Sequence, residues 1–391
     1  MNVPFEGPDP RRALLLDLFR TAVAAVDGRR RVRAALSGAH LPAPVSAFAA
    51  GKAAASMMAG ARDALGDLLG RGLVVAPDGA VPAALRADAG IRCLEAGHPR
   101  PDERSLAAGD ALLEFARSTR PGGTVLLLIS GGASALVEVP EAGVGLPELG
   151  ALFDRSLAEV WEIEQLNRER IGLSRIKGGR LPGLFPGSRI EALLISDVPR
   201  DDPVVIASGL VAAPGIAPRL VGSLDDAIEA AVRAAAARGL SAVPGPARLA
   251  GDAEAAARRI CHELAIAEAD LVVHGGETVV RLPARAGRGG RCQHLAVAAA
   301  RAIAGHDDYL ILAAGTDGRD GASDDAGAIV DAATCGRALD CGIDPAQALE
   351  NADSGPMLEA TGDLIHTGPT GTNVGDLVLA LRLARGTDLR M

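Results

Sequence analysis

Short apolar runs alternate with amphipathic segments along the first two thirds of the chain. Residues 124–130 are almost continuously apolar, which is typical of a strand buried on both faces of a parallel sheet. The pattern predicts strands at 45–50, 72–76, 92–96, 124–130 and 190–196, and helices at 11–26, 52–65, 101–116, 147–165 and 224–236. Strands that alternate with helices of this length predict a doubly wound, Rossmann-like α/β/α domain.

A stretch with two prolines and no amphipathic period, residues 239–247, marks the predicted domain boundary. We therefore expect an N-terminal domain at 1–240 and a second α/β domain at 241–391, each within the usual range of domain sizes. In the second domain the pattern predicts helices at 252–268, 292–303 and 376–385, and strands at 271–274 and 309–314.

The composition excludes several classes of protein. A net charge of -9 argues against nucleic acid or an anionic membrane as the partner. No apolar stretch approaches the ~18 residues of a membrane-spanning helix, and the N-terminus carries proline and acidic residues before its apolar run, unlike a secretory signal. The 5 cysteines contain no C-x-x-C pair. A disulfide framework or structural zinc site is therefore not expected, and the chain is predicted to be cytoplasmic.

Only two of the 40 basic residues are lysines, Lys52 and Lys177. Lys52 follows Gly51 at the start of a predicted helix, where the helix dipole disfavours a cation. This position suits a lysine that meets a phosphoryl or carboxylate group, although a surface lysine remains the alternative. The segment is not a P-loop, because Ser46 and Ala53 stand where that motif needs Gly and Ser or Thr.

Further polar clusters follow predicted strands, where the ligand crevice of an open α/β sheet lies. A glycine pair after a buried strand can turn backbone N–H groups toward an anion, and carboxylates at a strand end can meet Mg²⁺, a basic partner or water. The same residues could also form ordinary turns or solvated loops. These candidates are Ser130, Gly131, Gly132, Ser134, Asp197, Gly275, Gly276, Glu277, Thr278 and Asp317. Further candidates are Arg291 at the start of a predicted helix, Arg170 and Lys177 in the basic segment 166–180, and His366, Thr367 and Asn373 in the Gly- and hydroxyl-rich segment 366–373.

Several of these segments, taken in order, resemble the glycerate 2-kinase family, whose C-terminal part is called the MOFRL domain. The matching segments are Ile-Lys-Gly-Gly-Arg-Leu at 176–181, Ser-Asp-Val-Pro at 196–199, Gly-Gly-Glu-Thr at 275–278, Gly-Thr-Asp-Gly at 315–318 and His-Thr-Gly-Pro-Thr-Gly-Thr-Asn-Val at 366–374. The resemblance covers nearly the whole chain. It implies ATP-dependent phosphorylation of a small hydroxy acid, D-glycerate to 2-phosphoglycerate, with Mg²⁺ and in a cleft between the two domains.

The resemblance also implies roles for individual residues. The active-site lysine of the family matches Lys52, and its essential arginine matches Arg291; both would contact the substrate carboxylate or the transferring phosphoryl group. Asp197 and Asp317 would bind Mg²⁺ or orient the acceptor hydroxyl. The predicted ATP contacts are Ser130, Gly131, Gly132, Ser134, Lys177, Gly275, Gly276, Glu277 and Thr278, and the predicted substrate contacts are Arg170, His366, Thr367 and Asn373.

The chain departs from the family pattern at several positions. Ile171 and Gly172 replace a Lys-His pair, and Cys292 and His294 replace an amide and an acid. These changes leave open which hydroxy acid is the acceptor, and they keep a catalytically reduced nucleotide- or metabolite-binding relative as an alternative. An NAD(P)-dependent hydroxypyruvate reductase is a further alternative, although no G-x-G-x-x-G follows a predicted strand. A homo-oligomer is compatible with the sequence.

Overall fold

The computed structural model describes residues 9–159, 161 and 163–384, which belong to two compact units. We call them the parallel-sheet unit and the mixed-sheet unit, after their sheets. The parallel-sheet unit consists of Val26–Ser223 and Gly371–Val374. The mixed-sheet unit consists of Met1–Ala25, Leu224–Thr370 and Gly375–Met391.

The parallel-sheet unit is built on a 6-stranded sheet of order β3-β2-β1-β4-β5-β6, in which every neighbouring pair is parallel. The strand order reverses between β1 and β4, as in doubly wound folds. Every residue of β4 is buried, as its continuous apolar pattern predicts. The strands are β1 (Val45–Ala50), β2 (Leu69–Pro77), β3 (Ile91–Ala96), β4 (Thr124–Ser130), β5 (Arg189–Ile195) and β6 (Arg219–Gly222).

Helix α2 precedes the first strand of this unit, and the other helices lie between successive strands. The aliphatic core is completed by an edge-to-face contact between Phe115 and Phe185, whose ring centroids are 6.3 Å apart. One predicted helix, 147–165, is two helices in the structure, α7 and α8. The helices are α2 (Gly28–Leu36), α3 (Ala54–Leu65), α4 (Ala83–Arg86), α5 (Glu103–Arg117), α6 (Ala133–Leu136), α7 (Leu146–Ala158) and α8 (Ile163–Gly172).

The mixed-sheet unit has a 6-stranded sheet of order β11-β10-β9-β12-β8-β7. The pair β7–β8 is parallel, and the other neighbouring pairs are antiparallel. The strands are β7 (Ala242–Pro244), β8 (Leu271–Gly276), β9 (Tyr309–Gly315), β10 (Gly327–Asp331), β11 (Leu364–Ile365) and β12 (Asp376–Arg382).

The predicted helix at 376–385 is wrong over its described residues, because Asp376–Arg382 forms the central strand β12. The run Leu377–Leu381 is buried on both faces and therefore shows no alternation of apolar and polar residues. A short apolar run of this kind cannot be told from a buried helix by periodicity alone. Residues 385–391 lie outside the described residues.

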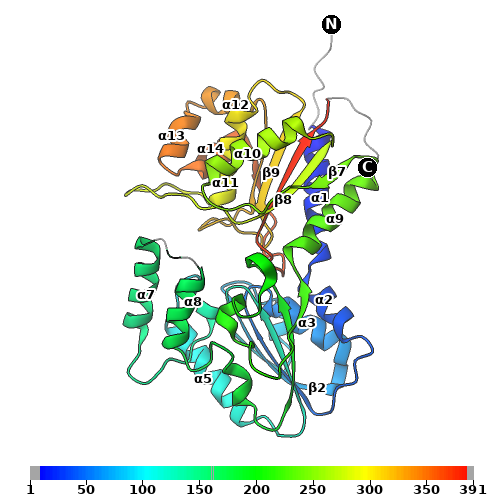
Figure 1. Cartoon of the computed structure of the whole chain (residues 1–391), viewed down its shortest axis with the longest axis vertical. Helices are drawn as coiled ribbons and strands as arrows, with labels where there is room; N and C mark the ends of the chain where they lie inside the picture. Colours follow the sequence, from blue (N-terminus) through cyan, green and yellow to red (C-terminus); the bar gives the residue numbers. More distant parts are fainter. Residues whose placement is uncertain (1–8, 160, 162, 385–391) are drawn as a thin grey trace. The chain divides into compact units, whose positions relative to one another are not determined.

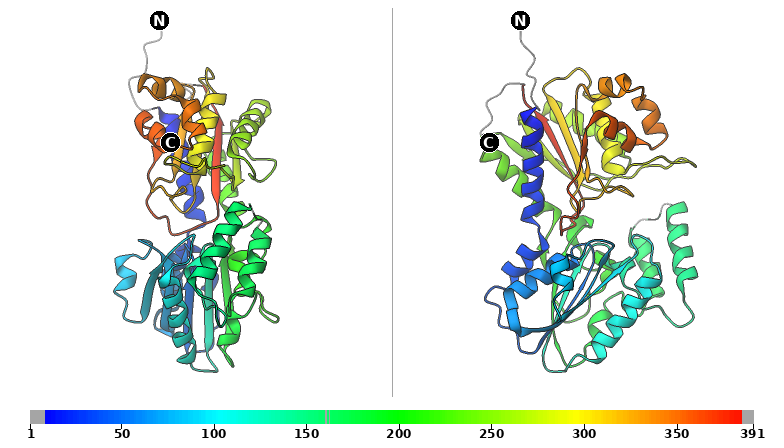
Figure 2. Two further views of the ribbon diagram at one scale, coloured as in Figure 1. Left: turned by 90° about the vertical axis from the view of Figure 1, so that its left-hand side faces the viewer. Right: turned by 180° about the vertical axis from the view of Figure 1, so that it is seen from behind.

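The helices of the mixed-sheet unit include the first helix of the chain. In Figures 1 and 2, α1 lies alongside the strands of this sheet, and it packs against α9. Helices α10 and α11 share a buried cluster with residues of β8, β9 and β12. The helices are α1 (Pro10–Ala25), α9 (Leu224–Ala236), α10 (Ala253–Ile266), α11 (Arg291–Ala302), α12 (Thr334–Asp340), α13 (Pro345–Glu350) and α14 (Ser354–Thr361).

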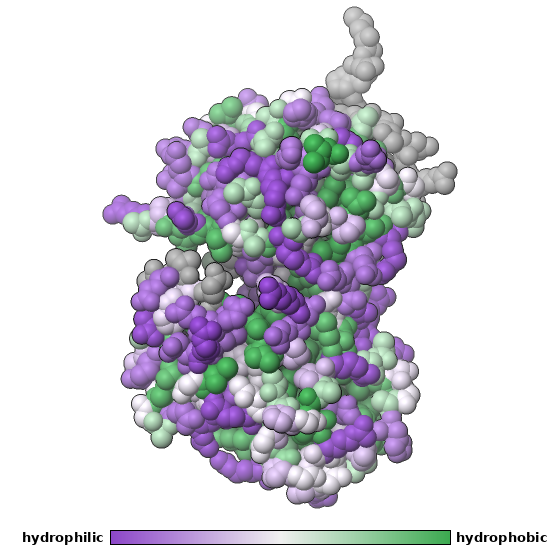
Figure 3. All heavy atoms as spheres, in the orientation of Figure 1, coloured by the Kyte–Doolittle hydropathy of each residue, from purple (hydrophilic) through white to green (hydrophobic). Residues whose placement is uncertain are grey.

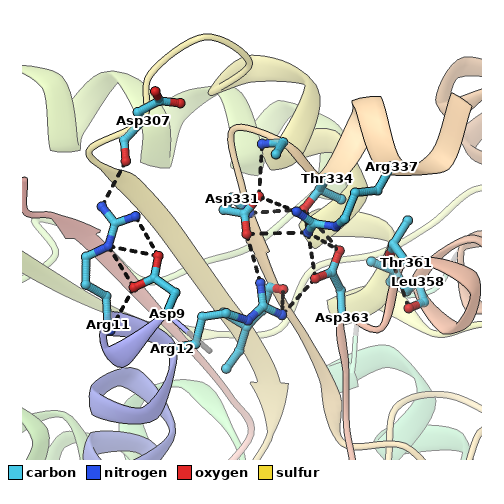
Figure 4. A network of polar contacts seen from close by, with 12 residues as sticks. Asp9, Arg11, Arg12, Asp307, Asp331, Thr334, Arg337, Leu358, Thr361 and Asp363 are labelled. Carbon is cyan, nitrogen blue, oxygen red and sulfur yellow. Dashed lines mark hydrogen bonds and ion pairs between the residues drawn. The ribbon is translucent and has the colours of Figure 1, made fainter. Parts of the chain in front are cut away.

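Two arginines attach α1 to strands far away in the sequence (Figure 4). Arg12 donates to Asp331 Oδ2 at 3.0 Å and to Asp363 Oδ1 at 2.7 Å. The guanidinium of Arg11 is buried and donates to the carbonyl oxygens of Asp307 at 2.8 Å and Leu383 at 2.7 Å. These bonds explain why the first helix belongs to the mixed-sheet unit.

The division into units differs from the predicted boundary at residue 240. The proline-containing stretch 239–247 lies inside the mixed-sheet unit, where it follows α9 and includes β7. The chain passes from one unit to the other at Ser223 and Leu224 instead. A local run of proline and glycine marks an interruption of regular structure, but it carries no information about which side of a boundary the flanking helices pack on.

The face of the molecule seen in Figure 3 carries mainly hydrophilic residues, with apolar residues in small groups among them. Within the described part of the chain, no helix combines the length and apolarity that crossing a membrane requires. All of the cysteines at positions 93, 261, 292, 335 and 341 are free thiols.

Candidate active site

The carboxyl ends of β1 and β4 meet where the strand order of the parallel sheet reverses. Lys52 follows β1, and Ser130 is the last residue of β4. Because these two strands are neighbours and their connections leave in opposite directions, a crevice forms beyond their ends in folds of this class. The topology therefore places two of the predicted site residues at the expected position of a ligand.

Backbone and side-chain hydrogen bonds join the turns after these two strands. Lys52 N donates to Gly131 O at 2.9 Å, and Ala53 N donates to Ser130 Oγ at 3.0 Å. Gly51 has φ +123°, and a Cβ at this position would overlap Ser130. The Ser130 hydroxyl thus holds the two turns together rather than standing apart as a ligand group.

The side chains of Asp197, His98 and Lys52 lie close to the turn Gly131–Gly132. A Cβ on Gly131 would overlap the carboxylate of Asp197, which follows β5. A Cβ on Gly132 would lie 3.2 Å from Nε2 of His98 and 3.3 Å from Cγ of Lys52. The turn therefore has an acidic neighbour at its first glycine and basic neighbours at its second.

Asn373 completes this cluster from the other end of the sequence. Its Nδ2 donates to Asp197 Oδ2 at 2.7 Å, and its side chain is buried. The structure thus brings together the predicted residues Lys52, Ser130, Gly131, Gly132, Asp197 and Asn373, although the chain separates them by up to 321 positions. Sequence reasoning missed His98. His98 comes after the predicted strand 92–96, separated from it by Gly97 alone. The rule that polar residues after a strand end mark the ligand crevice could therefore have identified it.

Ser134 lies just beyond the glycine turn, but its hydroxyl contacts other side chains of the unit. Ser134 Oγ is 2.6 Å from Ser208 Oγ, and Ser208 donates to Asn167 Oδ1 at 2.8 Å. Ser208 and its neighbour Ala207 have φ values of 55° and 50°, a backbone region that is costly for residues other than glycine. This internal network does not fit the predicted contact between Ser134 and ATP.

Lys177 is completely buried and forms an ion pair with Glu138, which is also buried. Burial lowers the pKa of the Lys177 ammonium, and the charge of Glu138 opposes this effect. Arg170 at the C-terminal end of α8 is near the same carboxylate, and burial lowers its pKa as well. A phosphate could reach Lys177 only by displacing Glu138 and the packing around it. This placement does not fit the predicted contact of Lys177 with ATP.

The mixed-sheet unit has its own cluster at one edge of its sheet, centred on Arg291. Arg291 Nε donates to Asp376 Oδ2 at 2.5 Å, and Nη2 donates to Asp376 Oδ1 at 3.1 Å and Glu277 Oε1 at 2.7 Å. Asp376 is the first residue of β12 and stands opposite Gly276 of β8 and Gly315 of β9. Because β12 runs antiparallel to both neighbours, its amino end supplies a carboxylate where they end. Asp376 was missed because the sequence pattern predicts a helix there.

The N-terminus of α11, where Arg291 lies, is capped by a carboxylate from a distant loop. Asp320 accepts from Cys292 N at 3.0 Å and from Gln293 N at 2.7 Å. Burial, with a further contribution from the charge of Asp376, raises the pKa of Asp320 to about 7. The protein itself therefore occupies the anion position that this helix terminus offers.

The glycine pair Gly275–Gly276 in β8 packs against its own unit. A Cβ on Gly275 would lie 2.8 Å from Leu224, and one on Gly276 would overlap the backbone of Leu249. Thr278 is buried, whereas Glu277 is exposed and contacts Arg291. Glycine is required here because Leu224 and Leu249 of the same unit lie close to the backbone. This packing differs from the predicted contact of the glycine pair with ATP.

The remaining predicted residues of this unit lie in loops. Asp317 follows β9, and its Oδ1 accepts from Arg319 N at 3.0 Å. His366 Nδ1 is 2.6 Å from Asp325 Oδ1, and Thr367 Oγ1 donates to Gly368 O at 2.9 Å. Among the described residues no group of three or more His, Cys, Asp or Glu is arranged to hold a metal ion.

Comparison with known proteins assigns the chain to a family. A family model described as "Domain of unknown function (DUF4147)" matches residues 14–234, and the model of the MOFRL family matches residues 270–376. The D-glycerate 2-kinase of Thermotoga maritima is 33% identical, over 96% of this chain and 99% of its own length. The chain belongs to the glycerate 2-kinase family.

A solved structure from the glycerate 2-kinase family has the same fold, and a further relative matches most of the sequence. A crystal structure of glycerate kinase from Thermotoga maritima superimposes with a TM-score of 0.84 at 32% identity, covering 96% of this chain and 100% of the other. A protein of Agrobacterium vitis, named provisionally as a hydroxypyruvate reductase, is 36% identical over 84% of this chain and 96% of its own length. The predicted two-domain α/β fold of a glycerate 2-kinase is thereby confirmed.

The departures from the glycerate 2-kinase pattern have structural positions that can now be described. Cys292 and His294 are buried in the first turn of α11, where they fill space between this helix and its neighbours. A Cβ on Gly178 would lie 2.9 Å from Cγ2 of Ile171, and Gly172 is the last residue of α8. Packing in the buried cluster of the mixed-sheet unit therefore accounts for Cys292, and nothing in the structure explains the choice of His294, Ile171 or Gly172.

Proposed function

We propose that this chain transfers the γ-phosphoryl group of ATP to the 2-hydroxyl group of D-glycerate. The observation that carries the proposal is the position of Lys52, beside the glycine turn at the switch point of the parallel sheet. The names of the relatives that match over nearly the full chain support the same reaction. Kinases of this type use ATP, so the glycine turn is the natural place for anionic oxygens of the reactants.

Positive charge is what phosphoryl transfer demands of the protein. Charge is spread over the oxygens of the transferring group, and fixed cations that meet it lower the barrier. Lys52 presents a compact ammonium on a flexible stem, which suits a group that moves during the reaction. Arg291 is oriented by two hydrogen bonds to Asp376 and one to Glu277, so its guanidinium is held in a fixed direction. We assign both residues to charge neutralisation.

The proposal includes Mg²⁺, for which the residues present are suitable. Mg²⁺ is usually bound by one or two carboxylates together with substrate phosphates and water, without a cage of protein ligands. Asp197 fits this requirement, because it stands at the end of β5 against the glycine turn and Asn373 holds its carboxylate at 2.7 Å. Asp317 is the second candidate ligand. The ion would neutralise phosphate charge.

The test is release of ADP by the purified full-length chain with ATP, Mg²⁺ and D-glycerate. We expect turnover, with ³¹P NMR identifying 2-phosphoglycerate rather than 3-phosphoglycerate as the product. A panel of other small hydroxy acids measures how selective the acceptor site is. Absence of ADP release with every member of the panel would contradict the proposed function.

The alternatives give different results in the same preparation. Hydroxypyruvate reduction would appear as oxidation of NADH, which we do not expect, because the turn after β1 carries Gly51-Lys52 in place of the dinucleotide fingerprint. A catalytically reduced relative would bind ATP in a titration without releasing ADP. One measurement thus distinguishes each alternative from the proposed kinase.

A further inference from the structure

His98 is an exposed histidine at the carboxyl edge of the parallel sheet. It follows β3, and in the sheet two strands, β2 and β1, lie between β3 and the strand β4 that precedes the glycine turn. Its imidazole edge faces Gly132, and a Cβ on that glycine would lie 3.1 Å from Cδ2 and 3.2 Å from Nε2 of His98. The same Cβ would lie 3.3 Å from Lys52 Cγ.

We propose that His98 is a further binding residue of this site, whose imidazole donates a hydrogen bond to an anionic oxygen of the ligand over Gly132. The inference deepens the proposed function and rests on it for the identity of that ligand. The chemistry that His98 recognises is an anionic oxygen, which either the phosphoryl group of ATP or the carboxylate of the hydroxy acid supplies.

The first argument is spatial. Gly132 has φ +86°, and any side chain there would occupy the space between the imidazole of His98 and the stem of Lys52. Glycine at this position therefore lets both nitrogen-bearing side chains lie against the turn. The backbone of a turn after a strand can approach an anion closely under the same conditions.

The second argument is the division of charge around the turn. Gly131 faces the carboxylate of Asp197, whereas Gly132 faces His98 and Lys52. A negatively charged group is repelled on the first side and attracted on the second. A ligand that carries both a bound cation and anionic oxygens would satisfy both sides, with its oxygens directed toward His98 and Lys52.

The third argument is chemical. Lysine donates from a point charge, whereas an imidazole donates from one ring nitrogen in a defined direction, and it does so whether neutral or protonated. Lys52 then supplies most of the charge and His98 supplies direction. Loss of one hydrogen bond to a charged group lowers affinity or rate by about 10- to 100-fold.

The test compares His98→Ala, His98→Gln and the control His40→Ala in the full chain. His40 is also exposed, but it precedes β1 and therefore belongs to the opposite edge of the sheet. We expect His98→Ala to lower kcat/KM about 10- to 100-fold, His98→Gln to recover part of this loss through its amide donor, and His40→Ala to have no effect. A rise in KM confined to ATP assigns the contact to the phosphoryl group, and one confined to D-glycerate assigns it to the carboxylate.

A second measurement keeps the proposal testable if the proposed function is wrong. The chain contains 7 histidines, and the ring signals of His98 are identified by NMR as those missing from His98→Gln. We expect ATP or D-glycerate to shift these signals whether or not turnover occurs. The proposal is overturned if kcat/KM of His98→Ala stays within twofold of the wild type or if neither compound shifts the His98 signals.

Discussion

Two glycine pairs end buried strands in this chain, Gly131–Gly132 after β4 and Gly275–Gly276 in β8, and the same sequence argument applies to both. In the parallel-sheet unit the pair is surrounded by side chains with functional chemistry, namely Asp197, His98 and Lys52. In the mixed-sheet unit the pair is pressed against Leu224 and Leu249. A glycine pair after a strand thus predicts a close approach of something to the backbone, and only the tertiary structure decides whether that is a ligand or the protein.

The cations of the two units lie in different settings. Lys52 follows the parallel strand β1, with its Cγ near the glycine turn, and Arg291 is bound by the carboxylates of Asp376 and Glu277. The difference follows from strand direction. Parallel strands collect only carboxyl ends at one edge, whereas the antiparallel strand β12 inserts its amino end, with Asp376, between the ends of β8 and β9.

The largest expected effect tests the role of Lys52. Lys52→Ala removes the cation beside the glycine turn, so we expect kcat to fall about 10³-fold, which corresponds to about 4 kcal/mol of transition-state stabilisation. Thermal unfolding should change little, because the side chain is only half-buried. Steady-state kinetics and calorimetry measure the two effects. Activity within a few-fold of the wild type would remove Lys52 from the mechanism.

The other lysine should show the reverse behaviour. Lys177→Ala leaves the carboxylate of Glu138 buried without its partner, which costs about 3 kcal/mol or more in the free energy of unfolding. Denaturant titration measures this loss. The double variant Lys177→Met with Glu138→Gln is the matched control, since it removes both charges and should recover part of the stability. If the single and double variants are equally stable, the ion pair is not what Lys177 contributes.

The two glycine pairs can be compared directly. Gly132→Ala places a methyl group between His98 and Lys52, and we expect kcat/KM to fall about 10- to 100-fold with about 1 kcal/mol lost from stability because φ is positive. Gly275→Ala instead forces Leu224 to move, which costs about 1–3 kcal/mol of stability. The ratio of activity loss to stability loss should therefore differ between the variants, and equal ratios would contradict the comparison.

The smallest expected effect concerns His274, the buried residue before Gly275. Burial lowers its pKa to about 4 in the folded chain, against an ordinary value of 6.5. Between these two values the unfolded chain binds a proton that the folded chain does not, so stability falls as the pH decreases. From pH 7 to pH 5 this loss amounts to about 2 kcal/mol.

His274→Gln removes this titration, so its free energy of unfolding should gain about 2 kcal/mol relative to the wild type over the same pH interval. Parallel denaturant titrations at pH 7 and pH 5 give the difference. If wild type and variant lose stability equally on acidification, then His274 is not the group responsible.

The sequence was most informative where local pattern and tertiary environment coincide. Strands 45–50 and 124–130 are predicted to the residue, because a strand buried on both faces in a parallel sheet is apolar throughout. The same property misleads at β12, where an equally apolar run in a mixed sheet follows no period. Apolarity indicates burial on all sides, and the direction and type of the element depend on its neighbours.

The candidate site shows a similar limit. Lys52, Asp197 and the turn Gly131–Gly132 were predicted because each follows a predicted strand, and the sheet order brings strand ends together. Ser134 was predicted because it follows a strand, and Lys177 because it lies in the basic segment 166–180. Their partners, Ser208 and Glu138, are buried groups that no local pattern indicates. His98 was missed although it follows a predicted strand, as the other candidates do. Asp376 was missed because the strand that it begins was predicted as a helix.

The hydrogen bonds between α1 and the mixed-sheet unit determine when this helix can pack during synthesis on the ribosome. Arg12 and its partner Asp331 are 319 residues apart. At a synthesis rate of about 5–20 residues per second, the ribosome releases α1 roughly 15–60 s before the strand it binds exists. The first helix is therefore synthesised before its partners in the mixed-sheet unit, and Asn373 joins the parallel-sheet unit only after residues 224–370 have been made.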